Sequence, residues 1–543
     1  MSDAGFHIPF PKNEPVLSYA PGSLERAQLK AELERQSNTT IEIPLIIGGK
    51  EIYTGRTGKI VMPHDHGHVL ATYHKAGPEE TKMAIEAALE AKKDWANMSW
   101  IDKASIFLKA AELLSTKYRH LVNAATMLGQ GKNVYQAEID AACESIDYLR
   151  YNPYFASLIN QWEPVSSSDS FNRMDYRPLE GFVFAVSPFN FTAIALNLAT
   201  APALMGNVVV WKPASTAVLS NYYLMQLYKE AGLPDGVINF LPGSGPDISN
   251  VVFNDPYFAG LHFTGSTSTF DGFWKTIVEH MDTYKTYPRI VGETGGKDFV
   301  VAHPSADPKA LITALIRGAF EYQGQKCSAA SRAYIPQSLW KEIKQELVDQ
   351  TESILMGDVR DFRNFVNAVI DEAAFDKIMG YIEKAKNSNV AKIIAGGQGD
   401  KTKGYFIRPT IIETQDPHFV TMEEEIFGPV LTVYVYEDNQ YEEILQLCNE
   451  TSPYGLTGSI FANDRKAINK AYEVLRFAAG NFYINDKPTG AVVGQQPFGG
   501  ARRSGTNDKA GSPFNLLRWI SPRTIKENFI PPTSWTYPFL QEE

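Results

Sequence analysis

The sequence GFVFAVSPFNFT, residues 181–192, is the first of four short apolar runs that each end in a turn-forming or polar cluster. The others are NVVVWKPAS (207–215), VINFLPGSG (237–245) and AGLHFTGSTS (259–268), with helical patterns between them such as SNYYLMQLYKEAG (220–232). Strands and helices that alternate at this interval predict βαβ units and a parallel, doubly wound α/β sheet. Ligands bind such sheets beyond the carboxyl ends of the strands, which is where these clusters stand.

A second alternating region extends over residues 291–485, with strand patterns in RPTIIETQD (408–416), GPVLTVYVYED (428–438) and LTGSIFAND (456–464). This pattern again predicts α/β structure.

The residues before the first run differ. IEIPLIIGGKEI (41–52) predicts two strands joined by a Gly-Gly turn, and apolar spacing predicts helices over 78–98, 103–118 and 134–152. The first 40 residues, rich in proline and then charged, are expected to form an arm.

The composition indicates a soluble globular protein with a large core. The 543 residues suffice for two or three domains, and 44% are hydrophobic against 21% charged. A net charge of −11 argues against a nucleic-acid partner, because phosphate binding needs a basic face. The N-terminus has neither an apolar signal core nor an Arg-rich amphipathic helix, and no run of about 18 apolar residues could span a bilayer. We therefore expect a cytoplasmic protein.

The three cysteines, Cys143, Cys327 and Cys448, are far apart and odd in number, which fits a reducing compartment and excludes a disulfide framework. Cys327 follows Lys326 in GQKCSAASR (324–332), and SAASR could open a helix. A nearby cation and a helix N-terminus both favour a reactive thiolate. Taken alone, however, the pattern is more typical of an inert buried thiol.

Two other residues could act with such a thiolate. Glu293 precedes a Gly-Gly pair in VGETGGKDFVV (291–301), and a carboxylate in a low-dielectric cleft can serve as a general base. The amide of Asn190 could stabilise an oxyanion. Each has an ordinary alternative, a solvated acid at a turn and a turn asparagine.

A nucleotide site is also compatible with the pattern. Lys212 ends a predicted strand and could contact a ribose or a phosphate, while Gly265, Ser266 and Thr267 stand at a predicted helix N-terminus suited to a pyrophosphate. An exposed lysine and a plain helix cap are the alternatives. There is no G-x-G-x-x-G fingerprint and no P-loop, so a dinucleotide would bind in another manner.

The alternating histidines His64, His66 and His68 could ligate a metal only with a second cluster to complete the shell. None is evident, so we expect a polar turn with exposed histidines and no metal.

The order of the motifs is more informative than any one of them. SPFN, WKPA, FTGST, ETGGK, GQKCSAASR, EEEIFGPV and PFGGARRSG follow one another as in the aldehyde dehydrogenase superfamily, which the chain resembles from about Ile43 to Lys526. The resemblance implies that Cys327 is the nucleophile and that Asn190 and the Cys327 backbone N–H hold the oxyanion of a thiohemiacetal. Glu293 would then activate water to hydrolyse the thioester left after hydride transfer.

The resemblance also implies NAD as the cofactor, with Lys212 and Glu425 at the two riboses and Phe427 beside the nicotinamide. The cofactor residues that it assigns are Ser187, Lys212, Gly265, Ser266, Thr267, Glu425 and Phe427. One position departs from the family pattern: many NAD-dependent members have glutamate three residues after the motif lysine, where this chain has Ser215. A carboxylate there would repel a 2′-phosphate, so its loss weakens the discrimination against NADP.

Within the superfamily, KCSAASRAYIP (326–336), ETGGKDF (293–299) and TGAVVGQQPFGGARRSGTNDKAG (489–511) resemble the branch that oxidises L-glutamate γ-semialdehyde, the open form of 1-pyrroline-5-carboxylate, to glutamate. The resemblance assigns six residues to this substrate. They are Ser328, Gly490 and Ala491 at the α-carboxylate, Phe191 and Phe498 along the aliphatic chain, and Glu144 near the α-amino group.

The implied fold is the aldehyde dehydrogenase fold, with a Rossmann-like NAD-binding domain, an α/β catalytic domain and a small β oligomerisation flap. The expected boundaries are an N-terminal arm over 1–40, the NAD-binding domain over 41–164 and 182–290, the catalytic domain over 291–485, the flap over 165–181 and 520–543, and a substrate anchor loop with the return to the NAD-binding domain over 486–519. A flap hairpin would have unpaired edges in a monomer, so we expect a homodimer or a larger assembly. The chain has no proline dehydrogenase domain, so a separate proline dehydrogenase is expected to supply the pyrroline and is a candidate transient partner. No membrane partner is expected.

Three alternatives stay open at this level: another semialdehyde as substrate, a non-catalytic relative, and a cysteine hydrolase. Another substrate would be indicated if an aldehyde without the α-carboxylate bound as tightly. A non-catalytic relative would have an unreactive Cys327 thiol. A cysteine hydrolase would turn over substrate without a cofactor.

Overall fold

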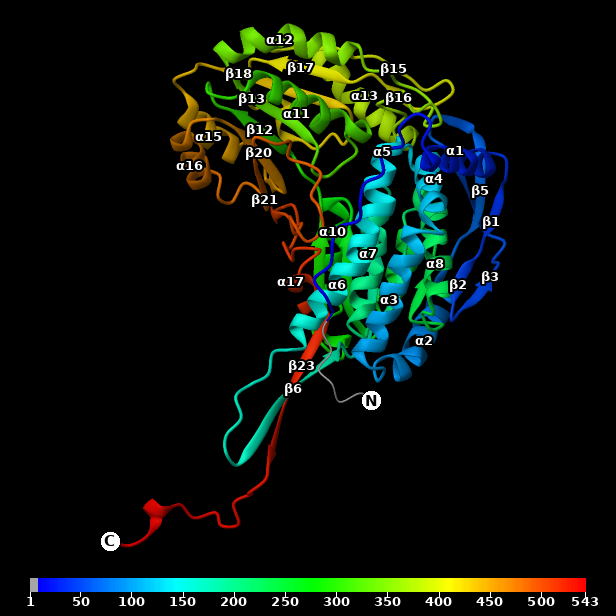
Figure 1. Cartoon of the computed structure of the whole chain (residues 1–543), viewed down its shortest axis with the longest axis vertical. Helices are drawn as coiled ribbons and strands as arrows, with labels where there is room; N and C mark the ends of the chain where they lie inside the picture. The colour runs from blue at the N-terminus through cyan, green and yellow to red at the C-terminus, as the bar shows by residue number, and fades with distance from the viewer. Residues whose placement is uncertain (1–7) are drawn as a thin grey trace.

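The computed structural model describes residues 8–543, so the first seven residues of the predicted arm lie outside it. Two α/β layers follow one another along the long axis of the molecule in Figure 1, and a two-stranded ribbon projects from the end remote from the second layer. No helix within residues 8–543 is both long and apolar enough to cross a membrane.

The first seven-stranded sheet contains the four apolar runs. In spatial order its strands are β11 (Arg289–Glu293), β10 (Phe258–Thr264), β7 (Phe182–Val186), β8 (Val208–Lys212), β9 (Ile238–Phe240), β2 (Leu45–Ile47) and β3 (Lys50–Ile52). The strands β11 to β9 run parallel, as predicted, and the predicted β2–β3 hairpin closes one edge antiparallel. Both β7 and β10 are buried along their whole length, as expected of central parallel strands.

The order of this sheet reverses at β7 and β10. From β7 the chain continues to β8 and β9 on one side, and it then returns to β10 and β11 on the other. The hydrogen-bond register pairs Val186 with Lys212 and with Phe263, and Thr264 with Glu293. The carboxyl ends of four strands therefore form one row beside a topological switch point, where α/β sheets bind their ligands.

The chain leaves the first sheet after Glu293 and enters the second seven-stranded sheet at Asp298. The boundary between the two domains was expected a few residues earlier, at 290/291. In spatial order its strands are β14 (Ala391–Ala395), β17 (Thr410–Thr414), β18 (Val430–Tyr436), β13 (Ala330–Pro336), β12 (Asp298–Ala302), β20 (Thr457–Phe461) and β21 (Asn481–Ile484). Only β14 is antiparallel to its neighbour.

Helices cover both faces of the second sheet because successive side chains of β12 point to opposite sides. Val300 and Ala302 pack with α11 (Pro308–Phe320) and α12 (Gln337–Glu352). Phe299 and Val301 pack with α15 (Tyr441–Glu450) and α16 (Arg465–Val474) on the other face. The helix α13 (Glu372–Lys386) forms a further cluster against β17 and β18.

Apart from the short α14 (Val420–Glu423), which contacts β13 in the second layer, the remaining α-helices surround the first sheet. They are α1 (Leu24–Ser37), α2 (Pro78–Trp95), α3 (Trp100–Ser115), α4 (Arg119–Gln130), α5 (Val134–Ala137), α6 (Ser145–Ile159), α7 (Thr192–Leu204), α8 (Val218–Ala231), α9 (Gly245–Phe253), α10 (Thr267–Glu279) and α17 (Pro513–Leu517). The segment predicted as one helix over 134–152 is interrupted by a π-helical stretch, η1 (Glu138–Glu144), which joins α5 to α6. Such π-segments are frequently found at functional sites.

The predicted exposure of the three histidines is wrong: His64 is buried, and His66 and His68 are half-buried. The segment forms a hairpin of β4 (Thr57–Met62) and β5 (Asp65–His74), and β5 also pairs with β1 (Ile41–Ile43). His64 lies buried in the turn, because residues 403–405 of the second layer cover it through the hydrogen bonds from His66 N–H to the Lys403 carbonyl and from Tyr405 N–H to the Pro63 carbonyl.

The projecting ribbon consists of β6 (Ser170–Pro178) and β23 (Ile520–Asn528), which lie in the two segments expected to form a flap. They pair antiparallel over their whole length, from Pro178 opposite Ile520 to Ser170 opposite Asn528. Both edges of the ribbon are unpaired within the described chain, and the residues that follow β23 remain exposed to the C-terminus (Figure 1).

Candidate active site

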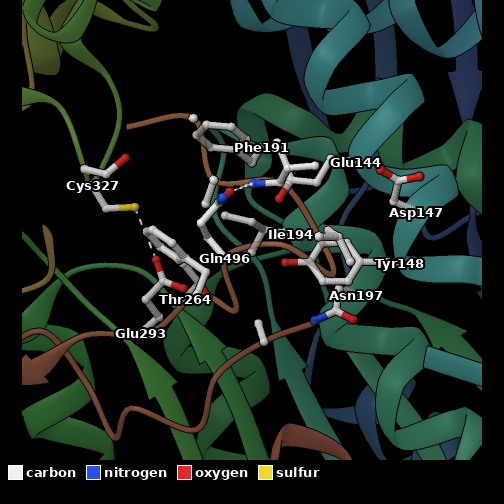
Figure 2. Close-up of a pocket in the computed structure, with 18 of the residues that line it drawn as sticks. Glu144, Asp147, Tyr148, Phe191, Ile194, Asn197, Thr264, Glu293, Cys327 and Gln496 are labelled. Atoms are coloured by element: carbon white, nitrogen blue, oxygen red, sulfur yellow. Dashed lines mark hydrogen bonds between the residues drawn. The ribbon is translucent and has the colours of Figure 1, made fainter. Parts of the chain in front are cut away.

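Cys327 and Glu293 form a hydrogen bond, although Glu293 belongs to the first sheet and Cys327 to a turn that leads into the second. Glu293 is the last residue of β11, and Cys327 stands in the turn that precedes β13. The Cys327 Sγ donates to Glu293 Oε1 over 3.2 Å (Figure 2). A thiol beside a carboxylate is the pairing of nucleophile and base that covalent catalysis needs.

The turn before Cys327 is held in an uncommon backbone conformation. Tyr322 and Gln323 have φ of 53° and 56°, in the left-handed region that bulky residues rarely adopt. The Tyr322 hydroxyl donates to the Gln130 carbonyl (2.9 Å), and the Gln323 amide donates to the carbonyls of Gly131 (2.8 Å) and Ala368 (2.9 Å). The turn is thus bonded both to the end of α4 and to the second layer, which fixes Cys327 between them.

Two sequence-based expectations about Cys327 are wrong. The residues after it enter β13 at Ala330 instead of opening a helix, because that segment is a central strand paired with β12 and β18. The Lys326 ammonium pairs with Glu321 Oε2 (3.2 Å) and makes no hydrogen bond to the thiol. Neither feature stabilises a thiolate.

The titration of the pair follows from its burial. Burial raises the pKa of Glu293 to about 7, against a smaller lowering by the Cys327 hydrogen bond. Burial and the Glu293 charge raise the pKa of the Cys327 thiol well above its ordinary value. At 3.2 Å the Glu293 carboxylate is placed to accept the proton of this thiol, and the raised pKa of the thiol makes that transfer uphill until the thiolate is consumed by attack.

The amide of Asn190 is buried beside the cysteine turn, where its Nδ2 donates to the Gln325 carbonyl over 3.0 Å. Asn190 lies in the loop from β7 to α7. A carboxylate of η1 holds the first N–H groups of α7. Asp140, in η1, accepts from Thr192 N–H (3.0 Å) and Ala193 N–H (2.8 Å). Asp140 itself is paired with the fully buried Lys132 over 2.6 Å.

A cavity of about 370 Å³ opens on Cys327 and Glu293. The structure brings all six predicted substrate residues to its wall, from four separate parts of the chain: Glu144, Phe191, Ser328, Gly490, Ala491 and Phe498. Glu144 stands at the end of the π-helical stretch, and burial together with the Asp140 charge raises its pKa well above the ordinary value. In Figure 2 Glu144 and Phe191 face the Cys327–Glu293 pair across the cavity.

Two residues of this wall that the sequence analysis did not single out support the anchor loop. Thr489 Oγ1 and Ser328 Oγ share a hydrogen bond of 2.8 Å. The Lys487 ammonium donates to the Thr489 carbonyl (3.1 Å) and lies so close to Gly490 that a Cβ there would be 2.9 Å from it. Gly490 has φ of 93°, which favours glycine.

Further residues of the wall, Asn13, Glu14, Asp147 and Tyr148, were also missed. Asn13 and Glu14 belong to the predicted arm, and Asp147 and Tyr148 to α6. Their spacing in the sequence carries no signal that points to this cavity, because they meet it only through the tertiary fold.

The predicted cofactor residues gather at the carboxyl row of the first sheet. Ser187 follows β7, and its N–H donates to the carbonyl of Lys212, the last residue of β8 (3.2 Å). Gly265 follows β10, and its N–H donates to the Glu293 carbonyl (3.2 Å). Ser266 caps the 13-residue helix α10, which begins at Thr267. The N-terminus of this helix therefore lies in the row, as predicted.

The features of this row fit a dinucleotide. Among residues 8–543 the Lys212 ammonium donates only to the adjacent Pro213 carbonyl (3.2 Å) and has no acidic partner. Burial lowers its pKa to about 8. A Cβ on Gly265 would lie 2.7 Å from the Phe263 ring, so only glycine fits there, and it adds no side chain to the backbone before α10. Uncovered N–H groups at a helix N-terminus favour a phosphate.

Glu425 and Phe427 reach the same row from the second layer. Glu425 Oε1 accepts from Gly296 N–H over 2.9 Å, just beyond β11. Phe427, with φ of 63°, packs edge-to-face on Phe189 of the β7–α7 loop, with ring centroids 5.9 Å apart. An acid and an aromatic ring therefore border the row on the side of Cys327.

Comparison with known proteins gives consistent matches over nearly the whole chain. The sequence profile of the Aldehyde dehydrogenase family matches residues 53–525. A Dictyostelium discoideum protein named "Delta-1-pyrroline-5-carboxylate dehydrogenase, mitochondrial" is 58% identical over 537 residues, which cover 98% of this chain and 96% of that protein. A Homo sapiens protein of the same name is 49% identical over 530 residues, covering 97% and 94%.

The structure is also similar to solved ones. That of "the Delta-pyrroline-5-carboxylate dehydrogenase from Mycobacterium tuberculosis bound with NAD" superimposes with a TM-score of 0.97 at 51% identity and covers 100% of both chains.

The cytoplasmic location predicted from the sequence is contradicted by these comparisons. The names of the Dictyostelium and human relatives place those proteins in mitochondria. The prediction rested only on failing to recognise a targeting signal, and it is wrong.

Proposed function

The chain belongs to the aldehyde dehydrogenase family, and on this premise we propose that it oxidises L-glutamate γ-semialdehyde, the open form of 1-pyrroline-5-carboxylate, to L-glutamate with NAD in proline breakdown. The observation that carries the proposal is the thiol–carboxylate pair, 3.2 Å apart, at the wall of a cavity that also contains the anchor-loop residues Gly490 and Ala491.

The first step uses the contact between the two catalytic side chains. Glu293 accepts the thiol proton, and the Cys327 sulfur attacks the aldehyde carbon while the carbonyl oxygen takes up the electron pair. The negative oxygen is stabilised by the Asn190 amide, turned from the Gln325 carbonyl, and by the Cys327 N–H. Acceptance of the hydride from this carbon is the chemistry that NAD, held by the residues named below, would supply. Collapse of the oxyanion restores the carbonyl as a thioester on Cys327.

The second step regenerates the thiol. Glu293 first loses its proton to solvent, then removes a proton from a water that attacks the thioester carbon. The C–S bond breaks, glutamate leaves, and the sulfur recovers a proton from Glu293. A pKa of about 7 lets one carboxyl group perform both transfers at neutral pH.

We propose that the substrate is oriented by its amino-acid end. The backbone N–H groups of Gly490 and Ala491 and the Ser328 hydroxyl would bind the α-carboxylate, with Phe191 and Phe498 beside the aliphatic chain. The Lys487 ammonium, which lies behind Gly490, supports this polarity. Glu144 would accept from the α-amino group.

We propose that the first layer binds the cofactor through Ser187, Lys212, Gly265, Ser266 and Thr267, with Glu425 and Phe427 from the second layer at the nicotinamide end. Lys212 would bind a ribose, and the start of α10 the pyrophosphate. Ser215 is exposed after β8, so no carboxylate from that position opposes a 2′-phosphate. We therefore expect the preference for NAD over NADP to be modest.

We propose that the ribbon of β6 and β23 is an oligomerisation flap and that the protein is a homodimer or larger. Two unpaired strand edges and the exposed apolar residues Phe171, Phe529 and Ile530 support this, because such edges are normally covered. We also propose a mitochondrial location, as in the named relatives, and a separate proline dehydrogenase that supplies the pyrroline.

The test is NADH formation from 1-pyrroline-5-carboxylate, followed by absorbance, in wild type and Cys327→Ala. We expect a signal that requires Cys327 and is larger with NAD than with NADP. Folded wild-type protein that oxidises other aldehydes but not this one would refute the substrate, and turnover without cofactor would refute the reaction.

A further inference from the structure

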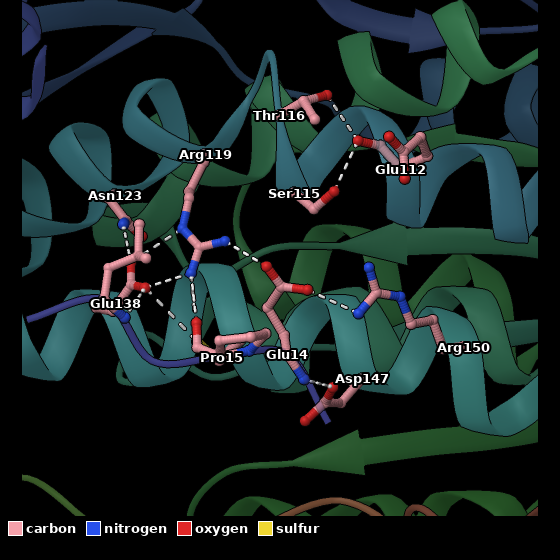
Figure 3. Close-up of polar contacts among 12 residues, drawn as sticks. Glu14, Pro15, Glu112, Ser115, Thr116, Arg119, Asn123, Glu138, Asp147 and Arg150 are labelled. Carbon is pink, nitrogen blue, oxygen red and sulfur yellow. Dashed lines mark hydrogen bonds and ion pairs between the residues drawn. The ribbon is translucent and has the colours of Figure 1, made fainter. Parts of the chain in front are cut away.

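Residues 8–19 form a strap that crosses the helices of the first layer and passes the active-site cavity at its middle. The strap contains no helix or strand, yet Asn13, Glu14 and Val16 line the cavity that holds Cys327. Its contacts with the helices, drawn in Figure 3, are ionic and specific.

Buried charges fix the strap in place. The Glu14 carboxylate lies between two guanidinium groups, accepting from Arg119 (2.5 Å) and Arg150 (2.7 Å). Arg119 pairs at the same time with Glu138, which also accepts from the Leu17 N–H (2.9 Å). The side chains of Glu14 and Arg119 are 10% and 5% exposed, so this pairing is shielded from solvent and from salt.

Asn13 connects the strap to both walls of the cavity entrance. Its Nδ2 donates to Asp147 Oδ2 of α6 and to the Val493 carbonyl, both over 2.8 Å. Its Oδ1 accepts from Gln495 Nε2 (2.9 Å). The Tyr151 hydroxyl lies 3.3 Å from the same oxygen and 3.2 Å from the Pro11 carbonyl, so its one proton is shared between the two acceptors. Both donors of the primary amide and its oxygen are therefore used here.

The loop that Asn13 holds, residues 490–496, makes few other hydrogen bonds to the rest of the described chain, and the Val493 side chain packs in the core. It contains no helix or strand, and its internal bonds join Val492 and Gln496 to each other. A Cβ on Gly494 would lie 2.3 Å from the Tyr151 ring, so the loop packs closely on α6 beside the Asn13 amide. The bonds of Asn13 to Val493 and Gln495 therefore fix the loop two to four residues beyond Ala491.

We propose that Asn13 is a positioning residue, which holds the 490–496 loop so that the Gly490 and Ala491 N–H groups converge on the substrate carboxylate. The role in catalysis rests on the proposed function, whereas the role in ordering the loop does not. The strap thereby makes the N-terminal segment part of substrate recognition, at a sequence separation of 480 residues from Val493.

The first test separates substrate anchoring from chemistry. In Asn13→Leu we expect KM for the semialdehyde to rise about tenfold with kcat little changed, because loss of these bonds loosens the anchor but leaves Cys327 in place. Gln495→Ala, at an exposed position, removes the bond from Gln495 to Asn13 and should raise KM by about threefold. Butanal, which has no carboxylate, should give the same kcat and KM in all variants. Lys12→Ala, an exposed change in the strap itself, is the matched control and should behave as wild type.

The second test needs no substrate. Hydrogen–deuterium exchange should become about tenfold faster in peptides covering 489–497 of Asn13→Leu, with the strands of both sheets unchanged. Unchanged exchange in that loop, or an unchanged KM for the semialdehyde in a wild type that oxidises it, would overturn the proposal. Faster exchange throughout, with butanal kinetics also impaired, would overturn it in favour of a general structural role. If wild type does not oxidise the semialdehyde, the proposed function fails, and the exchange measurement alone decides the role of Asn13.

Discussion

Replacing Glu293 by glutamine keeps the shape of the side chain but removes the carboxylate that accepts from the Cys327 thiol over 3.2 Å. The structure predicts that this one change slows both halves of the reaction, since the same oxygen would take the thiol proton before attack and the water proton before hydrolysis. A general base at such a position contributes about 10²–10⁴-fold to a rate, so we expect kcat to fall within that range.

The pH profile of the wild type gives a second check on the role of Glu293 as base. Only the carboxylate form of Glu293 can accept a proton, so activity rises with pH through its pKa. With a pKa of about 7, about half of the enzyme is competent at pH 7 and about a tenth at pH 6, so kcat should fall about fivefold from pH 7 to pH 6 and about tenfold for each further pH unit. An ordinary glutamate would leave the profile flat over that interval.

The assay is stopped-flow detection of NADH across this pH range, with Cys327→Ala as the blank. Wild type should follow the profile above, and Glu293→Gln should show a slowed first turnover as well as a slowed steady state, without the limb near pH 7. A normal first turnover in Glu293→Gln would refute the thiol–carboxylate proton transfer. A kcat within threefold of wild type would refute the role of Glu293 as base altogether.

Three further predictions follow from the same geometry. Asn190→Ala should lower kcat by about 10²–10³-fold with little change in KM, because its amide is needed most where the oxyanion develops; an unchanged kcat would remove Asn190 from the oxyanion site. Asp140→Ala leaves Lys132 buried without its partner and should cost about 3–5 kcal/mol in the free energy of unfolding by denaturant titration, whereas a loss below about 1 kcal/mol would show that Lys132 is deprotonated or hydrated there. Lys212→Met should raise KM for NAD about tenfold and leave KM for the semialdehyde unchanged, and equal effects on both would exclude a cofactor role.

The strands of the first sheet could be predicted from the sequence because their information is local. Each combines a short apolar run with a turn cluster, and central parallel strands are buried on both faces, so the pattern is strong in β7, β8 and β10. The start of α10 was predicted for the same reason, since Ser266 is a local N-cap signal.

The segment after Cys327 shows where local information fails. Small residues suit a helix start, yet Ala330 begins a central strand because pairing with β12 and β18 outweighs local preference. The π-helical stretch before Glu144 and the burial of His64 likewise depend on neighbours that are distant in sequence. The roles of Cys327, Glu293 and Asn190 came from the family resemblance, and their individual patterns alone favoured ordinary readings.

The contacts of the cavity entrance lay beyond any such reasoning. Asn13 and Gln495 are 482 positions apart, and no periodicity or motif connects them. Only the tertiary fold brings the two together.

The left-handed turn at Tyr322 and Gln323 has a consequence for how this protein fails under heat. Because that turn is bonded both to Gly131 and to Ala368, the nucleophile keeps its place only while the two layers stay in register. If warming breaks the bonds of Gln323 to Gly131 and Ala368, which form the joint between the layers, the enzyme should lose activity while each layer still retains its helices and strands. Thermal inactivation should therefore precede the loss of the circular dichroism signal, and the interval between the two curves would gauge the strength of the joint.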